Sequence, residues 1–366
     1  MMAMEESTER RALYRPESRG LTRKMMIDYY AEMDRYGFKE PFRKELANLF
    51  SKHNHRPGKT RRTNHVISHK TQYRRFVNLC SAFMDLGRMG PMIQSVHHLR
   101  EKHVAMLVRA WIEQGDTIGT IDNKLSYFRT LTEWLQKTGM IKQSRQYFPE
   151  NEYKRETVAT KDKTWSGSGV NIHEIITAIA FSDPVIAMQL ELQLAFGMRV
   201  EESMCYQPYK GLKEATTKAN ILIDKGTKGG RQREVTIDDI VQFDVLTRAA
   251  GFATGPNESM IPKVFTLIQW RQRYYKTIRK YGISRKEGLQ VTSHGLRHEY
   301  LNKVFENIMG VPSAVKGGHD YDAGKLDMAM QIVVERAGHW SKSKSQAYLG
   351  AVLINKRRGR PKTYVE

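Results

Sequence analysis

Four short segments in the second half of the chain carry side chains suited to chemistry on a phosphate. The first, residues 196–202, reads Phe-Gly-Met-Arg-Val-Glu-Glu and places Arg199 where a helix is expected to begin, three residues before Glu202. Residues three apart on a helix share a face, so the carboxylate can hold the guanidinium by charge-assisted hydrogen bonds. Taken alone, the same pattern also fits an ordinary arginine–glutamate pair on a surface.

The second segment is a glycine-rich turn between two strand-like stretches, and it contains Lys225 and Lys228. A lysine at such a turn can reach into a groove as a mobile point charge and proton donor. A basic hairpin tip with no role in catalysis is an equal alternative at this point.

The third and fourth segments supply histidine, arginine and tyrosine. In Ser-His-Gly-Leu-Arg-His, His294 and Arg297 are three residues apart, so both can meet one phosphate. Gly-His-Trp follows later, and Tyr348 lies nine residues after His339. Each segment is weak evidence by itself, because a tyrosine in a helix usually belongs to a core or an interface.

The charge of the chain favours a polyanionic partner. Its 366 residues include 60 Lys and Arg against 39 Asp and Glu, a formal net charge of +21. This excess would cause self-repulsion in the folded state unless a polyanion neutralised it. Nucleic acid is the first candidate, although ribosomal and membrane-surface proteins share the excess.

Cysteine usage and hydropathy favour the reducing cytoplasm, where a nucleic-acid partner would make the protein nucleoid-associated. Cys80 and Cys205 are too far apart for a disulfide framework and give no Cys-x-x-Cys pair for zinc. The N-terminus is acidic and then basic with no apolar run behind it, unlike a signal peptide. A membrane helix needs about 18 apolar residues or more, and the sequence contains no such run.

Periodicity and turn residues divide the chain into five parts. Residues 1–62 form an N-terminal extension with helices expected near 21–36 and 41–51, followed by a polar run that fits either a hinge or a DNA-contacting arm. Residues 63–148 form a helical domain, and Asp116 or Thr117 could cap its third helix. The other parts are an interdomain linker at 149–165, a larger domain at 166–355 and a basic tail at 356–366.

The larger domain is expected to combine helices with one β-hairpin. Asp183 followed by Pro184 is a good start signal for a helix that runs to Phe196. Two β-branched stretches, 221–223 and 234–237, flank the glycine-rich turn and predict the hairpin.

The four segments together, in this order, resemble the catalytic set of the tyrosine recombinase (phage-integrase) family. GMRVEES looks like its first arginine box, GTKGGRQREVTI like its lysine hairpin, HGLRH like its His-x-x-Arg box, and AGHW…AYLG like its final histidine-to-tyrosine segment. The helical domain before them is similar to the family's core-binding domain. The resemblance implies a mainly α protein with a small β-hairpin (α+β), whose core-binding and catalytic domains close as a C-shaped clamp on DNA.

The resemblance also implies the role of each residue. Tyr348 would attack the scissile phosphate to form a 3′-phosphotyrosine and release a 5′-hydroxyl, with no metal and no other cofactor. An unaided phenol has a pKa near 10 and is a poor nucleophile, so it needs help from its surroundings. The expected catalytic residues are Arg199, Lys228, His294, Arg297, His339 and Tyr348, supported by Glu202, Lys225, His298 and Trp340.

Lys228 is preferred over Lys225 by counting back from Val235-Thr236, where the family usually has Val-Pro. In the implied chemistry Arg199 and Arg297 clamp the phosphate oxygens, and Lys228 protonates the departing 5′ oxygen. His294 serves as the general acid/base, and His339 donates a hydrogen bond to the phosphate.

Basic residues outside these boxes are the expected contacts to double-stranded DNA. The tail's Arg-Gly-Arg-Pro resembles a minor-groove AT-hook; a solvated tail and docking on a neighbouring protomer are the alternatives. The family assembles four protomers around a Holliday junction, and accessory proteins can bend the DNA or set direction. The expected DNA contacts are Arg56, Lys59, Arg61, Arg62, Lys70, Arg74, Arg75, Lys124, Arg129, Arg231, Arg233, Arg357, Arg358 and Arg360.

The predicted function is therefore site-specific DNA recombination, as an integrase or excisionase of a mobile element. A DNA-binding protein with this fold but no chemistry is one alternative, and a type IB-like topoisomerase is another. A metal-binding regulator built on the scattered histidines is a remote third. The sequence does not select among integration, excision, resolution and inversion.

Overall fold

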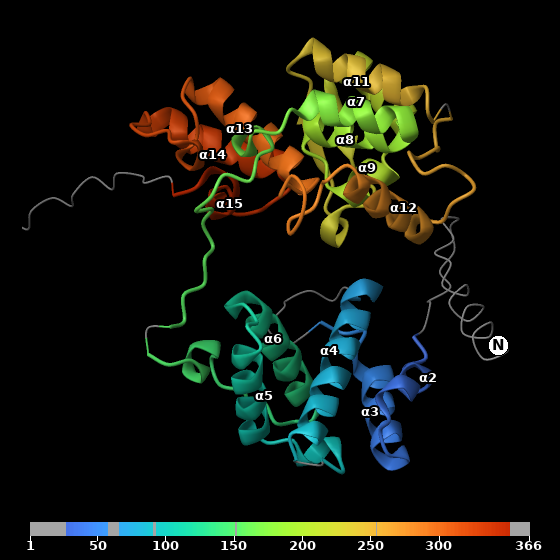
Figure 1. Ribbon diagram of the computed structural model, residues 1–366, viewed down its shortest axis with the longest axis vertical. Helices are drawn as coiled ribbons and strands as arrows, with labels where there is room; N and C mark the ends of the chain where they lie inside the picture. The colour runs from blue at the N-terminus through green and yellow to red at the C-terminus, as the bar shows by residue number, and fades with distance from the viewer. Residues whose placement is uncertain (1–26, 58–65, 91–92, 151, 254, 352–366) are drawn as a thin grey trace, which may run out of the picture. The chain divides into compact units, whose positions relative to one another are not determined.

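The computed structural model describes residues 27–57, 66–90, 93–150, 152–253 and 255–351 (Figure 1). The chain divides into two compact units, one formed by Arg19–Glu156 and the other by the chain from Thr157 onward. Each unit is described by itself. In the described ranges no helix is both long and apolar enough to cross a membrane.

The first unit is a bundle of helices whose starts match signals in the sequence. Pro41 lies in the first turn of α3, Ser68 caps α4 by accepting the Thr71 N–H, and Thr117 caps α6 by accepting the Thr120 N–H. The α-helices of this unit are α2 (Tyr29–Glu32), α3 (Glu40–His53), α4 (His69–Arg88), α5 (Glu101–Glu113) and α6 (Ile118–Trp134).

The N-terminal helices share the core of this bundle, which corrects the expected boundary at residue 62. The rings of Tyr29 and Phe50 lie 5.2 Å apart, and the ring of Phe42 lies 5.2 Å from that of Phe83 on α4. Buried aromatic side chains from α2 and α3 thus complete the hydrophobic core that α4, α5 and α6 begin. The described part of residues 1–62 is therefore an integral part of the helical domain.

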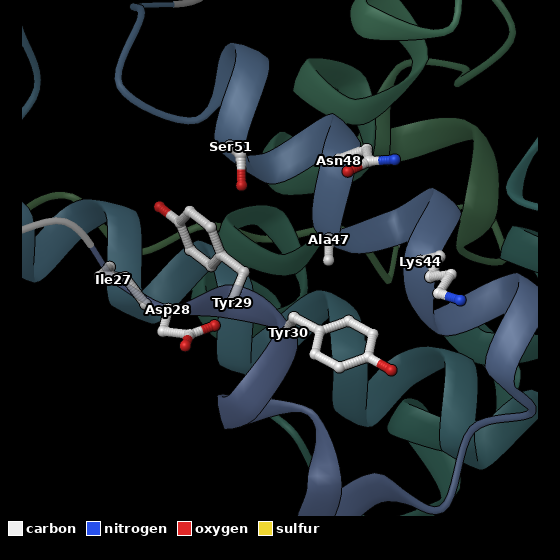
Figure 2. Close-up of a pocket in the computed structure, with 8 residues that line it drawn as sticks. All are labelled: Ile27, Asp28, Tyr29, Tyr30, Lys44, Ala47, Asn48 and Ser51. Carbon is white, nitrogen blue, oxygen red and sulfur yellow. The ribbon is translucent and has the colours of Figure 1, made fainter.

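A pocket opens between the same two helices (Figure 2). Its lining combines Tyr29 and Tyr30 of α2 with Ala47, Asn48 and Ser51 on α3. It contains none of the expected catalytic residues.

The second unit confirms the expected mixture of many helices and one small sheet. Strands β1 (Asn220–Ile223) and β2 (Arg233–Thr236) pair antiparallel, with Ile223 opposite Arg233. The α-helices are α7 (Ile172–Ser182), α8 (Pro184–Phe196), α9 (Val200–Cys205), α10 (Pro208–Lys218), α11 (Ile240–Ala250), α12 (Leu267–Lys280), α13 (His294–Met309), α14 (Ala323–Arg336) and α15 (Gln346–Leu349).

Helix α8 is the central element of this unit, packed against α7, α11 and α13 (Figure 1). It starts as predicted, with Asp183 capping the Ile186 N–H and Pro184 in the first turn. It ends at Gly197, which adopts a left-handed conformation (φ 58°). A Cβ at Gly197 would lie 2.5 Å from the ring of Tyr300, so only glycine fits where the chain turns toward Arg199.

Residues 157–165 belong to this unit, whereas we expected them to be part of a free linker at 149–165. The Ala159 N–H donates to the Gln346 carbonyl at 2.9 Å, and the indole Nε1 of Trp165 donates to the Thr292 carbonyl at 2.8 Å. Trp165 is fully buried. The segment is therefore fastened both to the start of α13 and to the short helix α15.

Candidate active site

A buried carboxylate organises the first half of the site. Both Glu202 oxygens accept hydrogen bonds from Arg233, at 2.9 and 2.7 Å, and Arg199 donates to the same carboxylate at 2.6 Å. Burial alone would raise the Glu202 pKa, but the charges of Arg233, Arg199 and Arg297 outweigh it and lower the pKa to about 2. Glu202 therefore stays ionised and fixes Arg199, as the sequence predicted for this pair.

Arg297 is held by main-chain carbonyls at the centre of the site. Its Nη1 donates to the Gly197 carbonyl and its Nη2 to the Ala337 carbonyl, while Nε lies 3.3 Å from the hydroxyl of Tyr348. Arg199 Nη2 also donates to the Ala337 carbonyl, at 3.0 Å. The two arginines therefore share an anchor, and the Arg297 side chain is fully buried whereas that of Arg199 is partly exposed.

Tyr348 lies where the expected histidines and Arg297 meet. His339 Nε2 is 3.1 Å from the Tyr348 hydroxyl, and the His298 ring centroid is 4.9 Å from the tyrosine ring. The His294 ring is farther away, at 6.4 Å. The histidine within hydrogen-bonding distance of the phenol in this structure is therefore His339, although the family resemblance gave the acid/base role to His294.

The segment that carries Tyr348 is fixed by a buried polar network that sequence reasoning missed. The Asn302 side-chain amide donates to the His298 carbonyl at 2.8 Å and to the Tyr348 carbonyl at 3.3 Å, and Asn302 Oδ1 accepts from the Ser313 hydroxyl. Asn302 and Ser313 are buried. They tie α13 to the main chain of α15, but their separation in sequence gives no signal of the contact.

Both candidate lysines lie at the hairpin turn and are exposed. Lys228 begins a short 3₁₀ turn, and its charge contributes to lowering the pKa of His339. Lys225 instead lies 4.0 Å from Asp224. Gly226 between them packs so closely on α9 that a Cβ would lie 2.2 Å from the Glu201 carbonyl oxygen, which fixes the turn beside Arg199.

The histidines of the site are neutral at neutral pH. Removal of the ring from water, and then the charges of Arg199 and Arg297, lowers the pKa of His339 to about 4. His294 lies at the exposed mouth of the site; the protein packed around it and the charge of Arg297 likewise lower its pKa to about 4. A neutral imidazole has a ring nitrogen that can accept a proton, while its lowered pKa also makes it a weaker base.

We expect His298 to make the free protein less stable in acid. Burial lowers its pKa to about 3, whereas an unfolded histidine titrates near 6.5. The unfolded chain therefore takes up the proton first, and stability is lost as pH falls from about 6.5 toward 3. The free energy of unfolding, measured with urea at pH values from 7 to 4, should fall less steeply for His298→Phe than for wild type. Equal slopes for the two proteins would contradict this.

Trp340 and Arg231 form a pair at the edge of the site. The Trp340 side chain is 88% exposed, and the Arg231 guanidinium lies 3.7 Å from the centre of its ring. Arg231 also contributes to lowering the pKa of His339. Trp340 therefore does not support the site by packing in a hydrophobic core.

Two of the expected DNA contacts need correction because their side chains are buried. Arg233 faces inward on β2 and pairs with Glu202. Arg75 is buried, and its Nη1 donates to Asn54 Oδ1 at 3.1 Å. Neither guanidinium is presented on a surface.

The remaining expected contacts fall into three groups. Arg56, Lys70 and Arg74 are exposed. Lys124 pairs with Asp116 at 2.6 Å, and Arg129 donates to the Lys142 carbonyl at 2.8 Å, so both are engaged within their own unit. The following lie outside the described residues: Lys59, Arg61, Arg62, Arg357, Arg358 and Arg360.

Comparison with known proteins shows the family to which the chain is related. The family model described as "Integrase" matches residues 157–303, and that described as "Phage integrase, N-terminal" matches residues 61–141. The chain belongs to the tyrosine recombinase family. The integrase match ends before His339 and Tyr348, so the placement of these two residues rests on the structure. No curated protein matches the chain.

Solved structures share the recombinase fold at low sequence identity. A lambda integrase tetramer bound to a Holliday junction is 15% identical, with a TM-score of 0.51 over 88% of this chain and 80% of that one. The Tn1549 transposon integrase in complex with a circular intermediate DNA is 12% identical, with a TM-score of 0.51 over 84% and 95%. A lambda integrase dimer on a core site is 15% identical, with a TM-score of 0.50 over 82% and 93%.

Proposed function

We propose that this protein is a site-specific DNA recombinase that cleaves and rejoins strands through a 3′-phosphotyrosine, as the integrase or excisionase of a mobile element. One observation carries the proposal. The Tyr348 hydroxyl lies within hydrogen-bonding reach of both His339 Nε2 (3.1 Å) and Arg297 Nε (3.3 Å), in a site that Arg199 also lines. A base and one cation thus contact the oxygen of the proposed nucleophile, and a second cation lies in the same site.

In the proposed reaction the phenol oxygen of Tyr348 forms a bond to phosphorus as the bond to the 5′ oxygen breaks. Neutral His339 accepts the phenol proton, and His294 at the mouth of the site can relay it to solvent. Arg199 and Arg297 stabilise the charge that gathers on the non-bridging oxygens. Lys228 gives a proton to the departing 5′ oxygen, and rejoining runs the same steps in reverse.

The proposed assembly follows the relatives only in outline. The lambda integrase structures hold a dimer on a core site and a tetramer on a Holliday junction. We propose that this chain likewise binds double-stranded DNA as a clamp made by its two units and pairs two sites within a homotetramer. Proteins that bend DNA or set direction are the expected accessory partners.

Covalent adducts trapped in the source cell test the proposal. Cells expressing the protein are lysed in denaturant with EDTA, and the DNA ends attached to the protein are sequenced. We expect adducts at one or a few loci, and we expect them to form and persist in EDTA, because the proposed cleavage uses arginine, lysine and histidine side chains and no metal ion. Adducts spread over the genome would indicate a topoisomerase instead, and the absence of adducts above background would indicate a protein that binds DNA without cutting it.

Binding to DNA should weaken steeply with salt. The net charge of +21 implies contact with several phosphates, and each contact releases condensed counterions. We expect the dissociation constant for the mapped site to rise at least about tenfold between roughly 50 and 200 mM salt, measured by fluorescence anisotropy. A flat response would rule out the clamp.

Lys228→Ala should slow strand cleavage by about a hundredfold or more, as expected for loss of a general acid. A DNA substrate with sulfur in place of the 5′ bridging oxygen should restore the rate, because its leaving group needs no proton. Lys225→Ala, a lysine three residues away on the same turn, is the matched control. If the sulfur-containing substrate instead restored the rate of Lys225→Ala, Lys225 would be the general acid.

A further inference from the structure

The exposed indole of Trp340 is unusual among the tryptophans of this chain. Trp111, Trp165 and Trp270 are buried, whereas Trp340 is 88% exposed. It follows His339 directly, in the segment that joins α14 to the short helix carrying Tyr348. A large flat apolar surface therefore faces solvent beside the proposed nucleophile, where a partner would have to cover it.

Arg231 gives this indole a defined position. The guanidinium stacks over the ring at 3.7 Å and comes from the hairpin turn, a different part of the chain. Its Nη1 is buried and has no hydrogen-bond partner. A buried donor without an acceptor is costly, so this nitrogen is suited to an acceptor that the ligand supplies.

The surrounding charge indicates which ligand fits. Arg199, Arg231 and Lys228 all act on His339 and carry positive charge, so the ligand presents anionic oxygens as well as an apolar face. A nucleotide has both features: a phosphate for Arg231 and a base for the indole. Stacking of bases on aromatic side chains is tolerant of sequence, and an arginine on the far face of the ring is compatible with it.

On the basis of the proposed function, we propose that Arg231 and Trp340 form a nucleotide subsite next to the scissile phosphate. The indole stacks on the nucleobase that flanks the cleaved bond, and Arg231 Nη1 donates to a neighbouring phosphate oxygen. Cleavage interrupts the backbone at this point, so the flanking base can leave the helical stack on one side. The subsite then supplies a stacking surface for that base during strand exchange.

Tryptophan fluorescence tests the stacking directly. The probe is the mapped duplex with a nick at the scissile phosphate, titrated onto Tyr348→Phe protein so that binding proceeds without cleavage. Anisotropy of a dye at the far end reports binding. We expect quenching of emission that disappears in Tyr348→Phe/Trp340→Phe, and that disappears again when the base beside the nick is replaced by an abasic site.

Cleavage kinetics on otherwise wild-type protein give a second readout. Trp340→Leu should lower the single-turnover cleavage rate by about fivefold to a hundredfold, the usual range for one base–aromatic stack, and Trp340→Tyr should restore most of it. On an abasic substrate, Trp340→Leu should have no further effect. Phe181→Leu is the matched control, because Phe181 is equally exposed but lies at the end of α7.

Three results would overturn the subsite. They are quenching that survives the abasic substitution, binding without quenching, and a Trp340→Leu protein that cleaves at the wild-type rate. With each of these results, the wild-type protein would still form adducts through Tyr348. Failure of the recombinase proposal looks different, because wild-type protein would then form no adducts at all.

Discussion

Tyr348→Phe should lower covalent adduct formation and strand joining by at least about 10⁴-fold, as loss of a nucleophile usually does, and should leave DNA binding unchanged. The hydroxyl is the atom that His339 and Arg297 contact, and the rest of the ring packs on His298. Phenylalanine keeps that packing and removes only the oxygen. The variant should therefore fold, bind and fail to cut.

Tyr300→Phe is the matched control for this experiment. Tyr300 is also buried and lies on α13 next to the site, where its hydroxyl accepts a hydrogen bond from Arg336 at 3.1 Å. Losing that bond costs about 1 kcal/mol of stability and should leave cleavage intact. Adducts formed by Tyr348→Phe at the wild-type level would show that another residue is the nucleophile.

Arg233→Ala should lower the free energy of unfolding by about 3–5 kcal/mol, the usual cost of removing one partner of a buried ion pair. Arg233 makes two hydrogen bonds to Glu202, and both side chains are buried. Without Arg233 the carboxylate loses its largest favourable interaction and holds Arg199 less firmly. Cleavage should fall as well, even at temperatures where the variant is folded.

The neighbouring pair Arg271–Glu201 provides the comparison. Glu201 adjoins Glu202 in sequence, and its ion pair with Arg271 at 2.8 Å is exposed, with about a third of each side chain accessible. Exposed pairs contribute about 0–1 kcal/mol, so Arg271→Ala should unfold at nearly the wild-type urea concentration. If Arg233→Ala and Arg271→Ala had the same urea midpoint, Glu202 would not organise the site.

Local signals in the sequence placed most of the elements that build the site. Asp183-Pro184 marked the start of α8, and the turn residues at 225–230 marked the hairpin. The spacing of His294 and Arg297, and the order of the family's boxes for His339 and Tyr348, named side chains that the structure brings together. The start of α8 and the hairpin follow from short-range patterns of capping and turn residues, whereas His339 and Tyr348 were identified only through the family resemblance.

The two wrong predictions of DNA contacts concern which face of its strand or helix each arginine occupies. Arg233 and Val235 alternate inward along β2, and this period of two was available in the sequence as a sign that Arg233 is buried. Arg75 directly precedes buried Phe76 on α4, but its partner Asn54 is the residue that caps the end of α3. The link between Asn302, Ser313 and Tyr348 depends on tertiary packing, which no local pattern encodes.

The carbonyl anchors of the two arginines bear on how such a site can change over evolutionary time. The groups that hold Arg297 belong to the main chain of Gly197 and Ala337, and every amino acid supplies the same carbonyl. Substitution at Ala337 leaves the acceptor in place, whereas a change at Gly197 or Gly338, both with positive φ, redirects the peptide that carries it. Side-chain substitutions around the two arginines are therefore tolerated as long as the turns at Gly197 and Gly338 keep their conformation.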